Sequence, residues 1–284
     1  MEIKRIGVVG AGTMGNGIAQ IAAQAGYFVV MRDTEMSFVE KGLKNIEMFL
    51  SKGVEKGKID NSEKTTILKR IKGTTNMADL SETDFIVEAV YENLDLKKSV
   101  FMELDELSKT DVILATNTSS MSITEIGAST KRPDKVCGMH FFNPVPLMRL
   151  VEIIRGYKTS DETIKTTIEL AQKIGKITVE VKKDSPGFIV NRIMIPHFLE
   201  AIKIVEEGIA SIEDVDNAVK NGLNYPMGPF ELMDLTGIDI AYFVSEYLYK
   251  ELNKENKWVA PNLLKTMVRA RKFGKKSGGG WYTK

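Results

Sequence analysis

Cysteine, net charge and long apolar runs are all scarce in this chain, and each shortage excludes a class of protein. The single cysteine, Cys137, excludes an internal disulfide, and because it lies in an apolar run we interpret it as a small core residue. The 39 basic and 38 acidic residues leave a net charge of +1, which gives no overall attraction for nucleic acid or an anionic membrane surface. No metal is expected, because cysteine and histidine show no metal-site spacing.

Membrane insertion and secretion are not expected either. No apolar run approaches the ~18 residues that a membrane-spanning helix needs. A predicted strand begins within the first few residues and leaves no room for a signal peptide, so we expect a cytoplasmic protein. The length of 284 residues and the 43% hydrophobic content predict a globular protein with roughly two domains.

A glycine-rich turn near the N-terminus follows a strand-like apolar run and precedes a helical pattern. Gly10, Gly12 and Gly15 fill the G-x-G-x-x-G spacing of a dinucleotide-binding turn. In such a turn the glycines allow the tight bend, the approach of backbone to a pyrophosphate and close packing of the helix on the sheet. Asp33 ends the next predicted strand, 18 positions after Gly15, where an acidic residue is expected to bind the ribose hydroxyls of NAD.

An extra pair of helices interrupts the strand–helix alternation and predicts a helical hairpin at about residues 35–72. Apolar residues between positions 39 and 54 repeat with the helical period, and Gly57 ends this first helix. The second helix is expected to run from Ser62, its candidate N-cap, to Ile71. Lys52 and Lys56 lie one turn apart, off the apolar stripe. Their spacing fits a solvated helix face, or alternatively a docking point for a polyphosphate.

The rest of the chain divides into an alternating part and a helical part. Further strands are expected at residues 85–87, 112–115, 135–142, 150–154 and 177–181. From Ser185 onward only helical patterns remain, at residues 188–207, 211–222, 230–252 and 262–273. Ser185 is a candidate N-cap for the first of these helices, and Pro196 is expected to kink it. The pattern predicts an α/β Rossmann-type domain with a mostly parallel, doubly wound sheet over residues 1–185, and an all-α domain over residues 186–284.

Of the two histidines, only His140 is a candidate for proton transfer. It lies near the end of a predicted strand, on the side of the sheet where ligands bind in this architecture. Glu152 lies on the next predicted strand, and adjacent strands would bring its carboxylate beside His140, where it would fix the imidazole tautomer. The alternative is a partly buried structural histidine. His197 lies beside Pro196 in a predicted helix and is interpreted as a packing or surface residue.

Several asparagines and serines near the strand ends are ambiguous from the residues alone. Asn117 and Ser119 follow one predicted strand, where ordinary turn chemistry explains both equally well. Asn143, in the loop after His140, is ambiguous for the same reason. Asn191 interrupts an apolar run near the start of the long helix, so it needs a polar partner such as a ligand.

Taken together, five segments resemble the L-3-hydroxyacyl-CoA dehydrogenase family, most closely its short bacterial 3-hydroxybutyryl-CoA dehydrogenases. They are residues 10–15 (GAGTMG), 116–120 (TNTSS), 140–146 (HFFNPVP), 186–192 (PGFIVNR) and 225–231 (YPMGPFE). The resemblance covers nearly the whole chain. It implies an NAD-dependent oxidoreductase that interconverts (S)-3-hydroxybutanoyl-CoA and acetoacetyl-CoA by hydride transfer. It also implies a homodimer formed through the C-terminal domain.

The resemblance assigns a role to each candidate residue. His140 is the implied general base and acid, and Glu152 is its carboxylate partner. Ser119 and Asn191 complete the implied catalytic set through contacts with the substrate. The implied substrate contacts are Ser119, His140, Asn143 and Asn191, with Lys52 and Lys56 at the CoA phosphates. The implied cofactor contacts are Gly10, Gly12, Thr13, Met14, Gly15, Asp33, Glu92, Lys97, Asn117, Ser119 and Asn143.

The sequence leaves alternatives open for the identity of the cofactor and for the substrate. Arg32 directly precedes Asp33, and an arginine near this place accommodates the 2′-phosphate of NADP, whereas the Asp33 carboxylate repels it. We therefore expect NAD, with NADP as the alternative. A related dehydrogenase would act on a free hydroxy acid instead of a CoA thioester, and a non-catalytic relative would bind NAD(H) without turnover.

Overall fold

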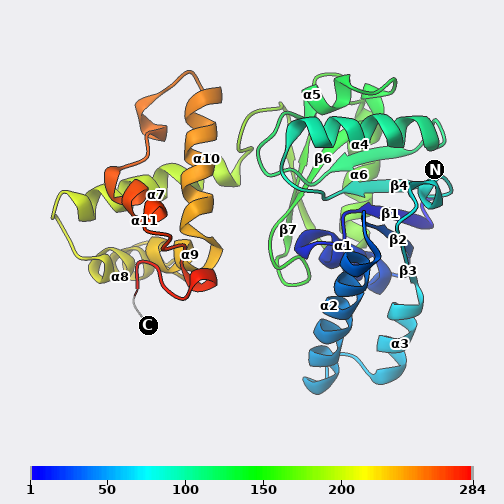
Figure 1. The fold of residues 1–284 in the computed structure, drawn as a ribbon, viewed down its shortest axis with the longest axis horizontal. Helices are drawn as coiled ribbons and strands as arrows, with labels where there is room; N and C mark the ends of the chain where they lie inside the picture. Colours follow the sequence, from blue (N-terminus) through cyan, green and yellow to red (C-terminus); the bar gives the residue numbers. More distant parts are fainter. Residues whose placement is uncertain (1, 283–284) are drawn as a thin grey trace. The chain divides into compact units, whose positions relative to one another are not determined.

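The computed structural model describes residues 2–282 and divides into two compact units, Met1–Ser185 and Pro186–Lys284 (Figure 1). We call these the N-terminal unit and the C-terminal unit. Each unit has its own cluster of buried hydrophobic side chains. The first unit combines a sheet with helices, and the second is built from helices.

The described residues of the N-terminal unit form one eight-stranded sheet. Its strands are β1 (Arg5–Val9), β2 (Phe28–Arg32), β3 (Ile71–Thr74), β4 (Phe85–Glu88), β5 (Ile113–Thr116), β6 (Val136–Phe141), β7 (Leu150–Ile154) and β8 (Ile177–Val181). In space they follow the order β3-β2-β1-β4-β5-β6-β7-β8. Strands β1 to β6 are parallel, whereas β7 pairs antiparallel with β6 and parallel with β8. The predicted α/β fold with a mostly parallel sheet is therefore confirmed.

Helices connect the parallel strands and cover the sheet. They are α1 (Thr13–Gln24), α2 (Met36–Glu55), α3 (Asn61–Lys69), α4 (Leu94–Leu107), α5 (Ile123–Ala128) and α6 (Asp161–Lys173), with short 3₁₀ turns at Met77–Leu80 and Pro133–Lys135. The strand order reverses between β1 and β4, and in open α/β sheets ligands bind beside the carboxyl ends of the strands at such a point. The glycine turn follows β1 at this place.

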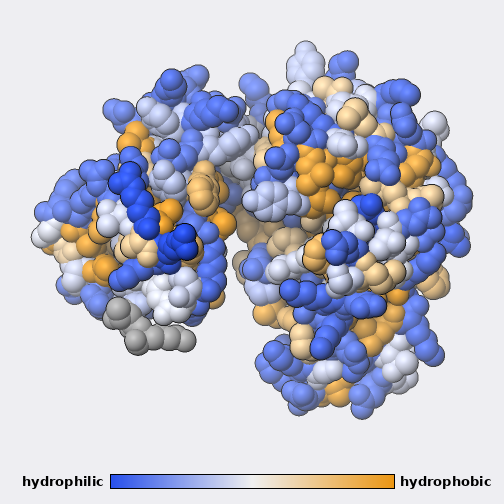
Figure 2. Space-filling model, viewed as in Figure 1, coloured by the Kyte–Doolittle hydropathy of each residue, from blue (hydrophilic) through white to orange (hydrophobic). Residues whose placement is uncertain are grey.

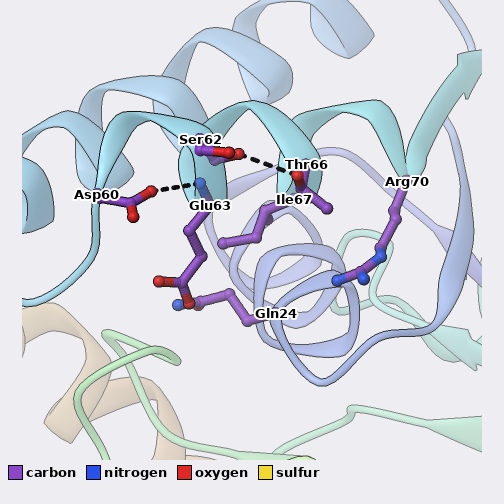
Figure 3. Close-up of a pocket in the computed structure, with 7 residues that line it drawn as sticks. All are labelled: Gln24, Asp60, Ser62, Glu63, Thr66, Ile67 and Arg70. Carbon is purple, nitrogen blue, oxygen red and sulfur yellow. Dashed lines mark hydrogen bonds between the residues drawn. The ribbon is translucent and has the colours of Figure 1, made fainter.

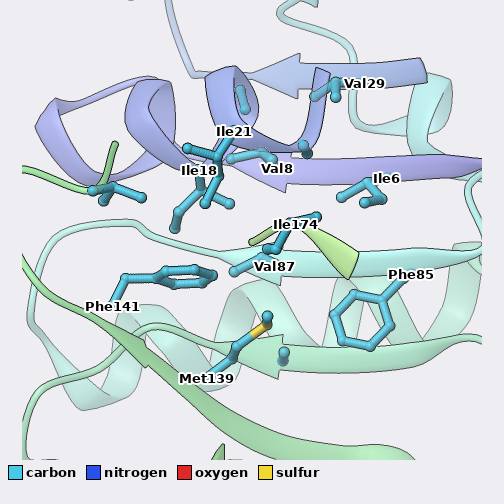
Figure 4. Close-up of a cluster of buried hydrophobic side chains, with 14 of the residues drawn as sticks. Ile6, Val8, Ile18, Ile21, Val29, Phe85, Val87, Met139, Phe141 and Ile174 are labelled. Atoms are coloured by element: carbon cyan, nitrogen blue, oxygen red, sulfur yellow. The ribbon is translucent and has the colours of Figure 1, made fainter. Parts of the chain in front are cut away.

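The core of the N-terminal unit lies where α1 packs on the sheet (Figure 4). Ile18 and Ile21 of α1 meet Val8 of β1 and neighbouring strand residues, all nearly fully buried. Phe85 on β4 is also fully buried, and burying one such side chain stabilises the fold by about 1.5–3 kcal/mol. This packing fixes the start of α1, and with it the glycine turn, against the sheet.

Helices α2 and α3 form the predicted hairpin, with two corrections at its second half. Asp60 is the N-cap of α3 and accepts a hydrogen bond from the Glu63 amide at 2.7 Å, so the prediction of Ser62 as N-cap was wrong. The helix ends at Lys69, and the residues after it form β3, which the sequence analysis did not predict. Between the two helices, the Lys64 ammonium donates to Ser51 Oγ at 2.9 Å.

The C-terminal unit consists of α7 (Val190–Glu206), α8 (Ile212–Gly222), α9 (Pro229–Thr236), α10 (Ile238–Glu251) and α11 (Asn262–Arg269), with 3₁₀ turns at Asn256–Trp258 and Lys275–Ser277. Ser211 is the N-cap of α8 and accepts from the Asp214 amide at 3.1 Å. The N-cap of α7 is Ile189, so the prediction of Ser185 in this role was wrong. The single helix predicted over residues 230–252 is two helices, because Gly237 adopts a φ of 114° that interrupts the helical backbone.

The buried carboxylates of Asp216 and Asp234 bind the last described residues of this unit, Trp281 and Tyr282. Asp234 accepts from the backbone amides of Trp281 and Tyr282 at 2.9 and 3.1 Å. Asp216 accepts from the Tyr282 hydroxyl at 2.7 Å and also from amides in the first turn of α9. The Trp281 ring packs edge-on against Phe230, with 5.0 Å between ring centroids. Over residues 2–282, no helix of either unit combines the length and apolar character needed to cross a membrane.

Candidate active site

The turn between β1 and α1 has the geometry that its glycines predict. Gly10 has a φ of 102°, and a Cβ there would lie 2.5 Å from the Ala89 carbonyl oxygen. A Cβ at Gly15 would lie 1.7 Å from the Gly10 carbonyl oxygen. A Cβ at Gly12 would meet nothing within 4 Å, so this side of the turn is open. The turn is therefore closed toward the sheet and accessible where a pyrophosphate would approach the start of α1.

Asp33 is bound to the same turn from the end of β2. Its Oδ2 accepts from the Ala11 amide at 2.7 Å, and its Oδ1 accepts from the Thr34 amide at 2.7 Å. These bonds hold the carboxylate beside the turn, at the position where the ribose of a dinucleotide is expected. The side chain of Arg32 is bound elsewhere, because its Nε donates to the Thr75 carbonyl at 3.3 Å.

A charged network with a fully buried core lies at the carboxyl end of β4. The Glu88 and Lys97 side chains are only 0% and 1% exposed, and Lys97 Nζ donates to Glu88 Oε1 at 2.8 Å. The same ammonium lies 3.2 Å from Glu92 Oε2. Glu92 Oε1 in turn accepts from the Thr118 hydroxyl and from the Ser119 amide. The network therefore connects the loop after β4 to the loop after β5, which carries Ser119.

Asn117 connects the ends of β5 and β6. Its side-chain oxygen accepts from the Phe141 amide at 2.9 Å, and its backbone amide donates to the Glu88 carbonyl at 2.8 Å. Asn117 is therefore buried, and its polar groups are hydrogen-bonded to neighbouring strands at this edge of the sheet. It follows β5 directly, as predicted, and its contact with a cofactor stays a prediction.

His140 and Glu152 face each other on the antiparallel strands β6 and β7. They are directly paired in register, and the distance from His140 Nδ1 to Glu152 Oε2 is 2.7 Å. His140 is 4% exposed and Glu152 is fully buried, so water does not compete for this contact. The His140 ring also packs against Phe142, with 4.5 Å between centroids. The expectation that adjacent strands bring these two side chains together is confirmed.

The loop after His140 is bound from two sides. Lys176 lies just before β8, is buried, and donates from Nζ to the carbonyl oxygens of Val145 and Met148 at 2.5 and 2.7 Å. On the other side, a Cβ at Gly17 of α1 would lie 2.8 Å from Val145 Cβ. The loop carries Asn143, which is exposed and follows Phe142 directly. No pattern in the sequence marks Lys176, because its partners are backbone atoms about 30 positions away.

The other predicted residues belong to the helical hairpin and to the C-terminal unit. Lys52 in the last turn of α2 and Lys56 just after it are both exposed on the hairpin, whose surface is mostly hydrophilic in the view of Figure 2. Asn191 lies in the C-terminal unit, in the first turn of α7, and is buried. His197 is half-buried among aromatic rings, and burial lowers its pKa, as fits a packing residue. The ligand contacts of Lys52, Lys56 and Asn191 stay predictions.

A hollow of about 370 Å³ lies between α1 and α3 (Figure 3). It is lined by Gln24, Asp60, Ser62, Glu63, Thr66, Ile67 and Arg70. Two of these side chains already make hydrogen bonds within the protein, since Asp60 caps α3 and Arg70 donates to the Ala23 carbonyl at 3.0 Å. Gln24 ends α1, so the hollow lies at the opposite end of this helix from the glycine turn.

The comparison with protein families identifies the group to which these features belong. Residues 5–185 match the model of the NAD-binding domain of 3-hydroxyacyl-CoA dehydrogenase, and residues 187–284 match the model of its C-terminal domain. The chain belongs to the 3-hydroxyacyl-CoA dehydrogenase family. The family predicted from the sequence is therefore confirmed, and with it an NAD-dependent oxidoreductase.

Individual members of the 3-hydroxyacyl-CoA dehydrogenase family are similar over the full length of the chain. A 3-hydroxybutyryl-CoA dehydrogenase of Clostridioides difficile is 49% identical over 98% of both chains. A probable 3-hydroxybutyryl-CoA dehydrogenase of Bacillus subtilis is 45% identical over 99% of this chain and 98% of its own. The crystal structure of (S)-3-hydroxybutyryl-CoA dehydrogenase from Ralstonia eutropha superposes with a TM-score of 0.96, at 45% identity and 99% coverage of both chains.

Proposed function

We propose that this protein interconverts (S)-3-hydroxybutanoyl-CoA and acetoacetyl-CoA with NAD as the redox cofactor. Relatives at 45–49% identity that carry the name 3-hydroxybutyryl-CoA dehydrogenase support this substrate class. The observation that carries the chemistry is the buried His140–Glu152 pair beside the edge of the sheet where the dinucleotide turn lies. A base of this kind is what the oxidation of a secondary alcohol requires.

In the proposed mechanism, His140 exchanges a proton with the substrate oxygen. Because Nδ1 faces the Glu152 carboxylate at 2.7 Å, we assign its proton to that contact, which gives the lone pair of the neutral ring to Nε2. Nε2 takes the proton of the 3-hydroxyl group as the carbonyl forms at C3. NAD held by the glycine turn and Asp33 would supply the nicotinamide that accepts the hydride from C3. The Glu152 carboxylate stabilises the resulting imidazolium. In the reverse direction, His140 returns the proton to the oxygen of the 3-oxo group.

The other residues position the two ligands in this proposal. The glycine turn and α1 hold the pyrophosphate, and Asp33 binds the ribose hydroxyls. Ser119 and Asn191 contact the substrate, and Asn143 aligns the site. Lys52 and Lys56 on the hairpin pair with the CoA phosphates. A homodimer formed through the C-terminal unit completes the proposal.

The assay that tests the proposal follows NADH absorbance at neutral pH after addition of acetoacetyl-CoA. Rapid oxidation is expected, with saturation by the CoA ester and none by free acetoacetate. Saturation by the free acid instead would support a dehydrogenase of free hydroxy acids. NADH binding without turnover of either compound would support a non-catalytic relative. Replacing NADH by NADPH tests the cofactor, and a kcat/KM with NADPH equal to or above that with NADH would contradict the role of Asp33.

A further inference from the structure

The fully buried carboxylate of Glu88, at the carboxyl end of β4, has no role in the mechanism above. Its side chain joins the loop after β4, helix α4 and the end of β5. Its Oε1 accepts from the Val90 amide at 2.7 Å and from Lys97 Nζ at 2.8 Å, and its Oε2 accepts from the Thr116 hydroxyl at 2.7 Å. Burying a carboxylate away from water is costly unless it is paired and hydrogen-bonded. A neutral apolar residue would suit an ordinary strand end better.

The contacts of the Lys97 ammonium indicate the role of the buried Glu88 carboxylate. Two carboxylates, Glu88 and Glu92, share one ammonium, and the shorter contact is with Glu88, at 2.8 Å against 3.2 Å. Glu88 therefore holds Lys97 in the interior, while Glu92, whose side chain is 39% exposed, faces the loop after β5. Through its Oε1, Glu92 accepts from Thr118 and from the Ser119 amide.

Glu88 also shapes the loop that borders the glycine turn. Its bond to the Val90 amide fixes the chain next to Ala89, whose carbonyl oxygen is the atom that a Cβ at Gly10 would meet at 2.5 Å. Its bond to Thr116 fixes the end of the neighbouring strand β5. One carboxylate thus connects the glycine turn, the loop of Glu92 and the loop of Ser119.

We propose that Glu88 is a positioning residue for the nicotinamide half of the cofactor, acting through Lys97 on Glu92 and the Ser119 loop. The proposal rests on the proposed NAD-dependent function and on the cofactor contacts that the family resemblance implies for Glu92, Lys97 and Ser119. Glu88 touches neither ligand. It is the counter-charge that keeps the Lys97 ammonium at a fixed place and leaves Glu92 available to the loop after β5.

The test is a double-variant cycle read out as the NADH dissociation constant, measured by fluorescence titration without substrate. Glu88→Gln keeps the shape of the side chain and removes its charge, and we expect the Kd to rise at least about tenfold. Lys97→Met is expected to weaken binding as well. Because Glu88 acts through Lys97, the double variant Glu88→Gln/Lys97→Met is expected to bind NADH no more weakly than Lys97→Met alone.

Asp105→Asn is the matched control, because Asp105 is a buried carboxylate near the other end of α4, paired with Arg132 Nε at 2.6 Å. The Kd of the Asp105→Asn variant for NADH is expected to stay within about twofold of that of the unmodified protein, even where the variant is less stable. The proposal is overturned if Glu88→Gln leaves the Kd unchanged, or if the effects of the two single variants multiply in the double variant.

A milder variant covers the case in which Glu88→Gln does not fold. Glu88→Asp keeps the charge and shortens the side chain, which draws the carboxylate away from Lys97 Nζ, its partner at 2.8 Å. We expect a rise in the Kd for NADH of about threefold or more, with unchanged helix content. An unchanged Kd in this variant overturns the proposal. These titrations are independent of the acyl substrate, so a wrong substrate assignment would not affect them.

Discussion

His140 on β6 and Glu152 on β7 are a directly paired couple of the antiparallel ladder, and their side chains meet at 2.7 Å inside the protein. Strand pairing fixes the distance between two such side chains far more tightly than a loop does, because opposite residues have Cβ atoms about 4.5–5.5 Å apart. The proposed proton-transfer pair is therefore part of the sheet itself.

His140→Gln removes the proposed base, and its kcat is expected to fall by at least about two orders of magnitude, since general base catalysis contributes about 10²–10⁴ in rate. The Kd for NADH is expected to stay close to that of the unmodified protein. Steady-state kinetics with acetoacetyl-CoA, together with an NADH titration, measure both values. A variant with near-normal kcat would rule His140 out as the base.

Glu152→Gln tests the partner separately. The amide group donates to Nδ1 or accepts from it without carrying charge, so the imidazolium loses its stabilising carboxylate and the tautomer is no longer fixed. We expect kcat to fall by about two orders of magnitude while circular dichroism stays unchanged. In the double variant His140→Gln/Glu152→Gln, the loss is expected to equal that of His140→Gln alone. Fully additive losses would mean that Glu152 acts independently of His140.

Lys176→Met removes the ammonium that binds the Val145 and Met148 carbonyls. The Val145 carbonyl then loses its donor in a buried place and the Met148 carbonyl in a partly buried one, and we expect the free energy of unfolding to fall by about 2 kcal/mol. The loop that carries Asn143 becomes less ordered, so kcat/KM for the acyl substrate is expected to fall as well. Lys173→Met, at an exposed position in the last turn of α6, is the control and should change neither value. Denaturant unfolding and steady-state kinetics give the two measurements.

Cys137 should be inert in the folded protein. The side chain is fully buried on β6, and burial raises the pKa of the thiol to about 12. Since the thiolate is the reactive form, a disulfide reagent at pH 8 is expected to label almost no protein under native conditions and one thiol per chain in guanidinium chloride. Rapid labelling of the native protein would show that this part of the sheet opens readily.

His197 should make the C-terminal unit less stable as the pH falls. Burial lowers the pKa of this histidine below its ordinary value of about 6.5, so the unfolded chain binds the proton more readily than the folded one. The stabilising contribution is therefore present above about pH 6.5 and is lost as the pH falls through that value toward the lower folded pKa. In His197→Phe, the free energy of unfolding is expected to depend less on pH between 7 and 5. An unchanged pH dependence would contradict this assignment.

Much of the N-terminal unit was predictable because its signals are local. The glycine spacing, the apolar runs and the acidic residue at the end of β2 lie within about 30 positions of one another, and each has one physical explanation. The His140–Glu152 contact was predictable for the same reason, since neighbouring strands with a short connection usually pair. The resemblance to the family then implied roles for residues such as Ser119 and Asn191, which their own chemistry left open, and these roles stay predictions.

The features that the sequence did not predict depend on long-range contacts or on one backbone angle. Strand β3 has only four residues, one of them Lys72 and another Gly73, so no apolar run marked it. Gly237 separates α9 from α10 within a continuous helical pattern, which periodicity cannot detect. Glu88 ends an apolar run as many surface residues do, and only the folded structure shows its contacts with Thr116 and Lys97.

The pairing of β6 with β7 has a consequence for how this protein tolerates change. A shift of one residue in the register would turn Glu152 to the opposite face of the sheet, and the length of the connection over residues 143–148 helps to set that register. Engineered versions of this connection therefore keep the His140–Glu152 couple only where its length preserves the register. They also need to retain Asn143 and to keep two carbonyl groups within reach of Lys176.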